Sequence, residues 1–230
     1  MKNLIRKMLT VLFPKRCRIC GEVIAFDSEV CDNCVSLPEI QLPICLKCGC
    51  SKSECICKKH NRSFEYKAVI APFYYEKQIQ QGILNFKMHA MPFLADGYGK
   101  FIADIVKKYY EQIDFDFVTY VPMRKSDEIN REFNQSKLLA QVVSGECDII
   151  LSDLLVKKRK TKKQKRQSAK ERFVNMYDVF DIAKGADVTD KTILLIDDVK
   201  TTGATLSSAS LILKAYGAKA VYCAVIAIVK

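Results

Sequence analysis

The sequence lacks the segments that anchor a protein in a membrane or direct its export. No stretch is apolar over the length needed to span a bilayer, about 20 residues. The first 17 residues place basic side chains before apolar ones, as a signal peptide does. However, Arg6 and Lys7 break the apolar run, and no small-residue cleavage site follows. These absences predict a cytoplasmic protein with no transmembrane segment.

Histidine is scarce, and aromatic side chains follow no sheet-like pattern. His60 and His89 are the only histidines, and neither lies in a site motif. The sequence therefore offers no histidine base for activating an acceptor. No aromatic-rich pattern of the kind that stacks nucleic-acid bases is visible. Cysteines, acidic pairs and basic runs carry the recognisable chemistry instead.

Positive charge is concentrated in one run. The formal net charge is +11, and residues 157–172 hold ten lysines and arginines against one acid, which leaves only +2 for the rest of the chain. Such a run fits a polyanion, because each neutralised phosphate adds affinity through counterion release. The alternative is a solvated, disordered charge run. The candidate nucleic-acid contacts are Lys157, Lys158, Arg159, Lys160, Lys162, Lys163 and Arg172.

Nine of the eleven cysteines lie between Cys17 and Cys57. Two CxxC pairs can give four thiolates to one tetrahedral zinc ion, and such a closed set leaves no open position for catalysis. This spacing predicts structural zinc in a reducing compartment rather than disulfides. Cys50 and His60 compete for ligation at the second of two predicted sites. The predicted ligands are Cys17, Cys20, Cys31 and Cys34 at the first site, and Cys45, Cys48, Cys55 and Cys57 at the second.

The chain divides into two predicted domains. Residues 1–63 hold the nine clustered cysteines and an amphipathic N-terminal helix, which packs on its own protein or touches a membrane or partner. Residues 64–230 alternate β-rich runs with helical patterns, which predicts a parallel sheet flanked by helices, with its ligand crevice at the carboxyl ends of the strands. The expected helices cover 78–88, 97–110 and 205–216, with a further helical face at Leu138, Leu139, Val142 and Val143. The expected strands are the β-rich runs over 66–75 and 117–122 and the segments 149–151, 193–196 and 220–229, with a connector over 179–186.

The most informative stretch is TILLIDDVKTTGATL, residues 192–206. It reads as a buried strand, a loop and a helix start. The loop residues Thr201, Thr202, Gly203, Ala204 and Thr205 would turn N–H groups and hydroxyls toward a phosphate at the helix N-terminus. Asp197 and Asp198 suit sugar hydroxyls or a hard cation such as Mg²⁺. The stretch resembles the phosphoribosyl pyrophosphate (PRPP) signature of type I phosphoribosyltransferases; the alternative is a threonine-capped helix after an acidic strand end.

The order of motifs along nearly the whole chain resembles the ComF family. Its marks here are the cysteine pairs, Phe86-Lys87, the Val-Pro-Met-Arg run at residues 121–124, Phe133-Asn134-Gln135, and the Asp-Asp loop, with Thr161–Gln164, Arg172 and Asn175 completing the series. Three positions depart from the usual family pattern: Glu132 where glycine is usual, a CxC at Cys55–Cys57, and Gln167 where leucine is common. The loss of glycine puts the geometry of that loop in doubt, because only glycine adopts positive φ freely.

The resemblance implies a type I phosphoribosyltransferase fold behind a small N-terminal zinc-binding domain. It implies PRPP and Mg²⁺ as ligand and cofactor, with Arg124 and Lys125 holding the pyrophosphate and residues 157–172 forming a flexible loop. It also implies a role in DNA uptake and transformation, with single-stranded DNA and a competence helicase as partners at the inner face of the membrane. Three functions stay open: an active transferase with an unknown acceptor, a non-catalytic PRPP-sensing adaptor, and a DNA-handling protein.

Overall fold

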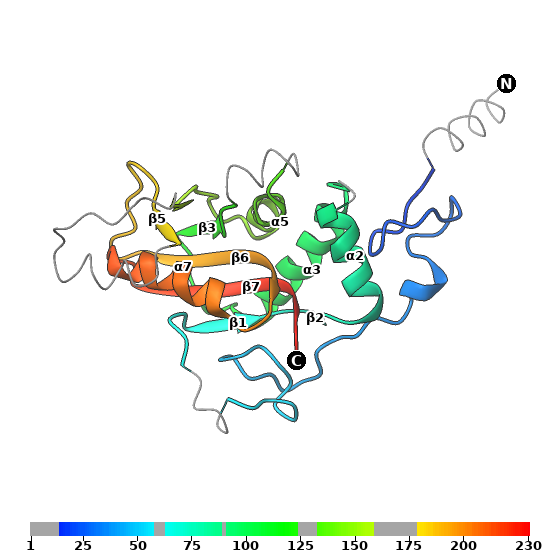
Figure 1. Cartoon of the computed structure of the whole chain (residues 1–230), viewed down its shortest axis with the longest axis horizontal. Coiled ribbons are helices and arrows are strands. Elements are labelled where there is room, and N and C mark those ends of the chain that lie inside the picture. Colours follow the sequence, from blue (N-terminus) through cyan, green and yellow to red (C-terminus); the bar gives the residue numbers. More distant parts are fainter. Residues whose placement is uncertain (1–13, 58–62, 89–90, 124–132, 159–178) are drawn as a thin grey trace.

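The computed structural model describes residues 14–57, 63–88, 91–123, 133–158 and 179–230 (Figure 1). Its centre is a parallel sheet in the order β1–β7–β6–β3, with β2 also paired to β7. The parallel pairing confirms the predicted α/β class. The strands are β1 (Ala68–Ile70), β2 (Phe73–Tyr74), β3 (Phe117–Tyr120), β6 (Thr192–Lys200) and β7 (Ala220–Ile228).

Helices cover both faces of the sheet because strand side chains alternate between them. Leu194 and Ile196 of β6 pack with the helices α2 (Lys77–Met88), α3 (Leu94–Tyr109) and α5 (Gln135–Cys147). Ile193 and Leu195 pack on the other face with α7 (Ala204–Ala215). The inner strands are buried on both sides, which explains their nearly continuous apolar sequence.

Two predictions around the basic run are wrong. The expected strand at 149–151 forms only an isolated bridge between Leu151 and Val118, and the expected connector over 179–186 contains a strand. That strand, β5 (Phe180–Ile182), pairs antiparallel with β4 (Leu155–Lys157) outside the main sheet. Three-residue strands are too short to produce a readable hydrophobic period, and burial of Leu155 and Phe180 stabilises this pair instead.

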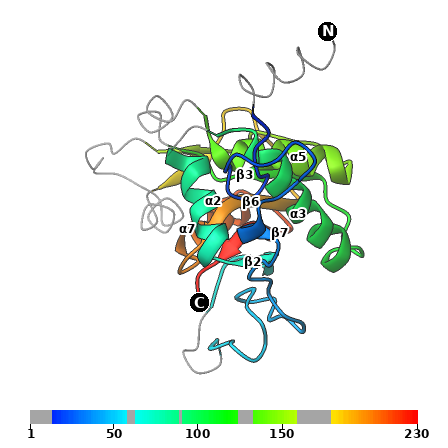
Figure 2. The same cartoon turned by 90° about the vertical axis from the view of Figure 1, so that its right-hand side faces the viewer.

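The cysteine-rich segment lies along the α/β unit rather than apart from it. Its one helical element is the 3₁₀ turn η1 (Asp32–Cys34) within the described part of the segment. Figures 1 and 2 show its first half beside α2, and its second half hydrogen-bonds to the sheet, where Val69 N–H donates to the Leu46 carbonyl at 2.8 Å. The domain boundary between residues 63 and 64 stays a prediction. Within the described ranges, no helix is long and apolar enough to cross a membrane.

Candidate functional site

The two acids of the motif lie where β6 runs past its neighbour. β3 pairs with β6 only up to Tyr120 opposite Ile196, and the last backbone bond joins Val121 N–H to the Ile196 carbonyl. The β6 strand itself continues to Lys200 along β7, so Asp197 and Asp198 lie within the strand rather than after it. The two acids therefore lie beyond the last β3–β6 pair, at the carboxyl end of the sheet.

Asp197 is the buried member of the pair, with 9% of its surface exposed. Its Oδ1 accepts hydrogen bonds from Ser136 Oγ at 2.8 Å and from the Asp198 backbone N–H at 2.9 Å. Burial, followed by the charge of Asp198, raises the pKa of Asp197 to about 7, although both hydrogen bonds favour the ionised form. A buried carboxyl group with a pKa this near neutrality is typical of a binding or catalytic site.

Asp198 is held by a lysine from another element. Its Oδ2 lies 2.7 Å from Lys87 Nζ, and its Oδ1 accepts from the Val199 backbone N–H at 2.6 Å. Lys87 belongs to the last turn of α2, which lies on the same face of the sheet as α3 and α5. Adjacent carboxylates of this kind suit a hard cation such as Mg²⁺, so the residues present fit that ion.

The loop after β6 presents an open helix N-terminus. Gly203 is the N-cap of α7 with φ of 85°, a left-handed conformation that favours glycine, and no side chain caps the helix from that position. Thr202 Oγ1 accepts a long 3.3 Å bond from Ala204 N–H, while Thr201, Thr202, Ala204 and Thr205 are all exposed. The structure therefore brings the five predicted loop residues together at a helix terminus suited to a phosphate.

Two aromatic side chains pack against this loop at Gly203. Phe64 and Tyr66 stack with ring centroids 5.0 Å apart, and a Cβ on Gly203 would lie 2.9 Å from Phe64 Cε1 and 3.1 Å from the Tyr66 hydroxyl. Lys200 is buried, with its Nζ 5.6 Å from the centroid of the Phe64 ring. Phe64 and Tyr66, which follow the second cysteine group in the sequence, thus pack against the phosphate loop.

Ser136 and Lys87 are site residues that the sequence reasoning missed. Both stand in motifs that were recognised only as family marks, because Ser136 directly follows Asn134-Gln135 and Lys87 follows Phe86. Asn134 caps α5 through Lys137 N–H and donates to the Val121 carbonyl at 3.2 Å, which places Ser136 opposite Asp197. Predicted residues outside the described ranges are Arg124, Lys125, Arg159, Lys160, Lys162, Lys163 and Arg172.

The predicted cysteine sets converge as two separate clusters. In each set the four Sγ atoms lie within 4.8 Å of one another, and Cys20–Cys31 and Cys48–Cys55 are 3.6 Å apart. Zinc–sulfur bonds of about 2.3 Å in a tetrahedron require sulfurs about 3.8 Å apart, so both sets fit zinc. Cys50 is buried beside the second set but is not one of its four converging residues, and His60 lies outside the described residues.

Known proteins share both halves of this arrangement. A family model described as a phosphoribosyl transferase domain matches residues 134–229, and one described as a double zinc ribbon domain matches residues 8–66. Competence protein ComFC of Streptococcus pneumoniae is 28% identical over 230 residues, covering 89% of this chain and 96% of that protein. Competence protein ComFC of Bacillus subtilis is 28% identical over 193 residues, covering 80% and 77%.

This chain belongs to the ComF family. The phosphoribosyl transferase match and the parallel sheet give this ComF-family chain the type I phosphoribosyltransferase fold, and the double zinc ribbon match identifies zinc as the metal of its cysteine-rich segment. Among solved structures, glutamine PRPP amidotransferase from B. subtilis aligns with a TM-score of 0.41 and 20% identity, covering 57% of this chain and 25% of that one.

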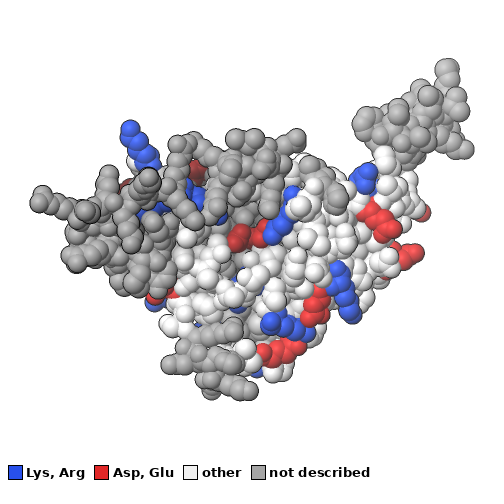
Figure 3. Space-filling view, in the orientation of Figure 1, with Lys and Arg blue, Asp and Glu red and all other residues white. Residues whose placement is uncertain are grey.

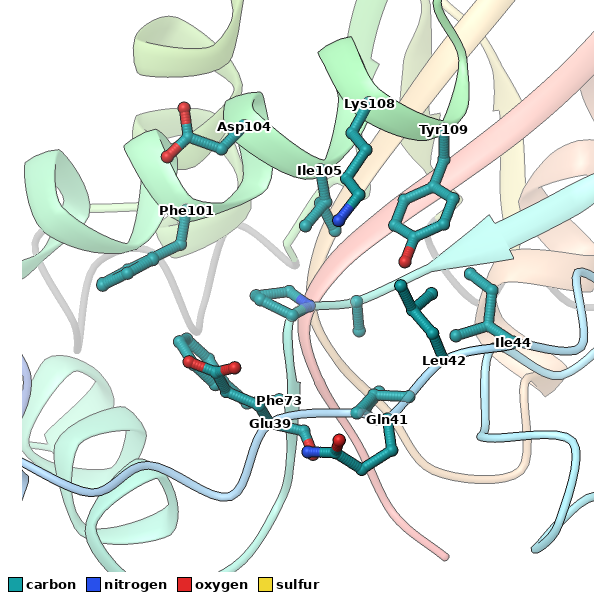
Figure 4. Close-up of a pocket in the computed structure, with 13 residues that line it drawn as sticks. Glu39, Gln41, Leu42, Ile44, Phe73, Phe101, Asp104, Ile105, Lys108 and Tyr109 are labelled. Atoms are coloured by element: carbon teal, nitrogen blue, oxygen red, sulfur yellow. The ribbon is translucent and has the colours of Figure 1, made fainter.

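One cavity of this ComF-family chain lies away from the acids. It has a volume of about 380 Å³ and is bounded by the linker at Glu39–Ile44, the β1–β2 turn and the outer side of α3 (Figure 4). Phe101, Asp104 and Lys108 are among its lining residues. No residue of the predicted site lines it, so the acid pair and the phosphate loop are the candidate functional site.

Proposed function

We propose that this chain acts in DNA uptake during natural transformation and binds PRPP with Mg²⁺ in the pocket around Asp197 and Asp198. The relatives it matches are named competence proteins, which supports the first part. The second part rests on one observation: the acid pair stands on β6 shortly before the N-terminus of α7, where the N-cap residue Gly203 provides no side-chain cap. A phosphate cradle beside a diol or metal site describes a phosphorylated ribose.

The residues take separate parts of this ligand. The exposed N–H and hydroxyl groups of Thr201–Thr205 bind the 5′-phosphate, and the two acids take the ribose hydroxyls. Bound Mg²⁺ would supply charge to the departing pyrophosphate. Arg124 and Lys125 are proposed to hold the pyrophosphate, because they follow Val121 in the sequence and the Val121 N–H donates to the carbonyl of Ile196, the residue before Asp197. The eight converging cysteines are proposed as the ligands of two structural zinc ions.

Turnover is a separate question from binding. Displacement of pyrophosphate at C1 of the ribose requires an acceptor, and transition-state charge of oxocarbenium type is stabilised mainly through the leaving group. The same pocket would suit an active transferase or a PRPP-sensing adaptor that binds PRPP and catalyses no transfer. A pyrophosphate-release assay with candidate acceptors separates the two, because an adaptor binds PRPP without releasing pyrophosphate.

Calorimetry with PRPP and Mg²⁺ tests the binding proposal. In the double variant Asp197→Asn with Asp198→Asn, shape is kept while both charges are lost, so affinity should fall at least tenfold, about 1.4 kcal/mol. Asp187→Asn with Asp190→Asn is the matched control, since these two exposed acids precede β6 at the opposite edge of the sheet. Equal PRPP binding by the site variant and the wild type would show that the acids do not form the pocket.

The charge distribution favours a second function, handling of single-stranded DNA through residues 157–172. The described residues carry 20 lysines and arginines against 21 acids, so the net positive charge of the chain resides in the remaining segments. Figure 3 agrees: on the described part of that face, basic and acidic side chains lie next to one another without a large patch of one sign. Such a protein would work in the cytoplasm at the inner face of the membrane, with a competence helicase as partner.

A further inference from the structure

Lys87 is an unexpected component of the acid pocket. Its Nζ lies 2.7 Å from Asp198 Oδ2, and the two side chains are only 23% and 14% exposed. The charge of Lys87 also lowers the pKa of Asp197, as a smaller influence than burial, Asp198 and the two hydrogen bonds. An ion pair this sheltered from water is much less screened than a surface pair.

The first zinc-binding knuckle holds the helix that carries Lys87. Asn85 Nδ2 donates to the Cys20 carbonyl at 2.6 Å, and the Tyr98 hydroxyl of α3 donates to the Ile19 carbonyl at 2.6 Å. A Cβ on Gly82 would collide with the Ile19 carbonyl and the Tyr98 hydroxyl, so α2 lies directly against the knuckle. This close packing explains why glycine stands at that position of the helix.

The base of the Lys87 side chain is equally constrained. The preceding residue, Phe86, is fully buried and packs against Phe133 with ring centroids 5.8 Å apart. Phe133 is followed directly by Asn134, which caps α5. The last turn of α2 therefore contacts both the first knuckle and the start of α5, and Lys87 projects from a fixed backbone toward the acids.

The charges decide what such a pocket attracts. Two ionised carboxylates on adjacent residues would draw a free divalent cation and repel a ligand that carries several phosphates. The Lys87 ammonium paired with Asp198 reduces that negative charge and places a hydrogen-bond donor next to the acids. Unlike a metal ion, this cation is covalently part of the chain and is present before any ligand arrives.

We propose that Lys87 sets the charge selectivity of the pocket, holding free divalent cations off Asp198 while attracting the anionic ligand. The inference rests on the proposed PRPP function and adds a residue to it. Lys87 is then a ligand-contacting residue, and the first zinc knuckle is what positions it. The proposal predicts effects of opposite sign on a cation and on an anion, which a merely loosened pocket cannot produce.

Lys87→Met tests the proposal, because methionine keeps most of the stem and removes the charge. Mn²⁺ titration without PRPP, followed by the spectroscopic signal of the free ion, should show binding tightened about tenfold, whereas calorimetry should show PRPP affinity lowered about tenfold. The Asp197→Asn, Asp198→Asn protein gives the background for Mn²⁺ bound elsewhere. Lys87→Arg should restore both wild-type affinities, and Lys100→Met, which breaks an exposed pair with Asp96 on α3, should change neither.

The outcomes separate the two proposals. Lower affinity of Lys87→Met for both Mn²⁺ and PRPP would mean a structural role and would overturn the inference, as would no change in either. Melting temperatures of the zinc-loaded proteins check that the variants are folded. If the wild type binds no PRPP, the proposed function fails by itself, because tighter Mn²⁺ binding by Lys87→Met still supports the role of Lys87 and unchanged binding still overturns it.

Discussion

The two zinc ribbons have the same local structure and support opposite halves of the pocket. In each, a CxxCG knuckle closes with a bond from the glycine N–H to the first cysteine carbonyl, at 2.8 Å for Gly21 and 2.6 Å for Gly49. A second bond joins the first cysteine N–H to the carbonyl of Glu22 in one ribbon and Cys50 in the other. The shared knuckle thus says nothing about where a ribbon docks.

Docking is decided by the residues around the knuckles. The first ribbon presents the Ile19 and Cys20 carbonyls to α3 and α2, and so faces the side of Lys87 and Asp198. The second pairs with the sheet edge at Val69, and its Ser51 N–H donates to the Tyr74 hydroxyl at 2.9 Å. Phe64 and Tyr66, which come after the second ribbon in the sequence, pack against the phosphate loop at Gly203. A segment too short for its own core can therefore act as a scaffold for a neighbouring site.

The largest expected effects come from breaking one ribbon at a time. Cys31→Ser and Cys55→Ser each remove one ligand at a position away from the docking contacts, so zinc content should fall from two ions to one per chain. Structural zinc contributes on the order of 10 kcal/mol to folding its segment, so the affected ribbon should unfold locally. Elemental analysis measures the zinc, and Mn²⁺ titration tests the comparison, because only Cys31→Ser should resemble Lys87→Met.

Cys50→Ser is the control for both ribbon variants. Its Sγ is not among the converging sulfurs, so zinc should stay at two ions per chain. Identical Mn²⁺ binding by Cys31→Ser and Cys55→Ser would contradict the separate roles of the ribbons. Disulfides within residues 17–57 under reducing conditions would contradict zinc binding itself.

A smaller effect should follow from disturbing the phosphate loop alone. In Gly203→Val, a branched side chain meets Phe64 and Tyr66 at a backbone φ of 85° that valine strongly disfavours. The loop must shift, and PRPP affinity should fall at least tenfold, about 1.4 kcal/mol, in calorimetry. Mn²⁺ binding at the acids should change little, since the added side chain meets Phe64, Tyr66 and Lys200 rather than Lys87 or Asp198. If Gly203→Val lost both PRPP binding and Mn²⁺ binding, the phosphate loop and the acid pair would not be separable parts of the site.

The local parts of the site could be predicted from the sequence, and the long-range parts could not. The acid pair, the phosphate loop and α7 are consecutive, so one strand–loop–helix pattern contains them all. The cysteine sets are equally local. Ser136 lies 61 residues from Asp197, and the Lys87–Asp198 pair depends on the docking of α2 against a zinc knuckle. No periodicity encodes such a contact, because it is decided by packing between elements.

The shortest strands were not predicted from the sequence, for a related reason. β4 and β5 are three residues each and gain their stability from burial of Leu155 and Phe180 and from pairing across the basic run. Propensity over three residues carries little information, and tertiary context overrides it. The extension of β6 beyond Ile196 was missed too, because polar residues end the apolar run while β7 continues to pair with the strand.

The smallest expected effect on PRPP affinity comes from changing the basic run, residues 157–172. In the described residues, neither ribbon contacts this run. Any general affinity for single-stranded DNA should reside in residues 157–172 and fall steeply as salt rises. Replacing six of its basic residues with glutamine should flatten that salt slope in a binding titration, while PRPP affinity changes much less. The six are Lys157, Lys158, Arg159, Lys160, Lys162 and Lys163.

A charge-matched control decides whether the run or the total charge matters. Six exposed lysines elsewhere can be changed to glutamine with the same loss of charge, namely Lys47, Lys52, Lys67, Lys107, Lys108 and Lys219. This control should keep most of the salt slope, because counterion release follows phosphates contacted together rather than net charge. If the run closes over PRPP, it cannot also lie along DNA, and PRPP titrated into the DNA complex should then release the DNA. No binding at low salt, or equal slopes in both six-fold variants, would leave the run without a role in DNA contact.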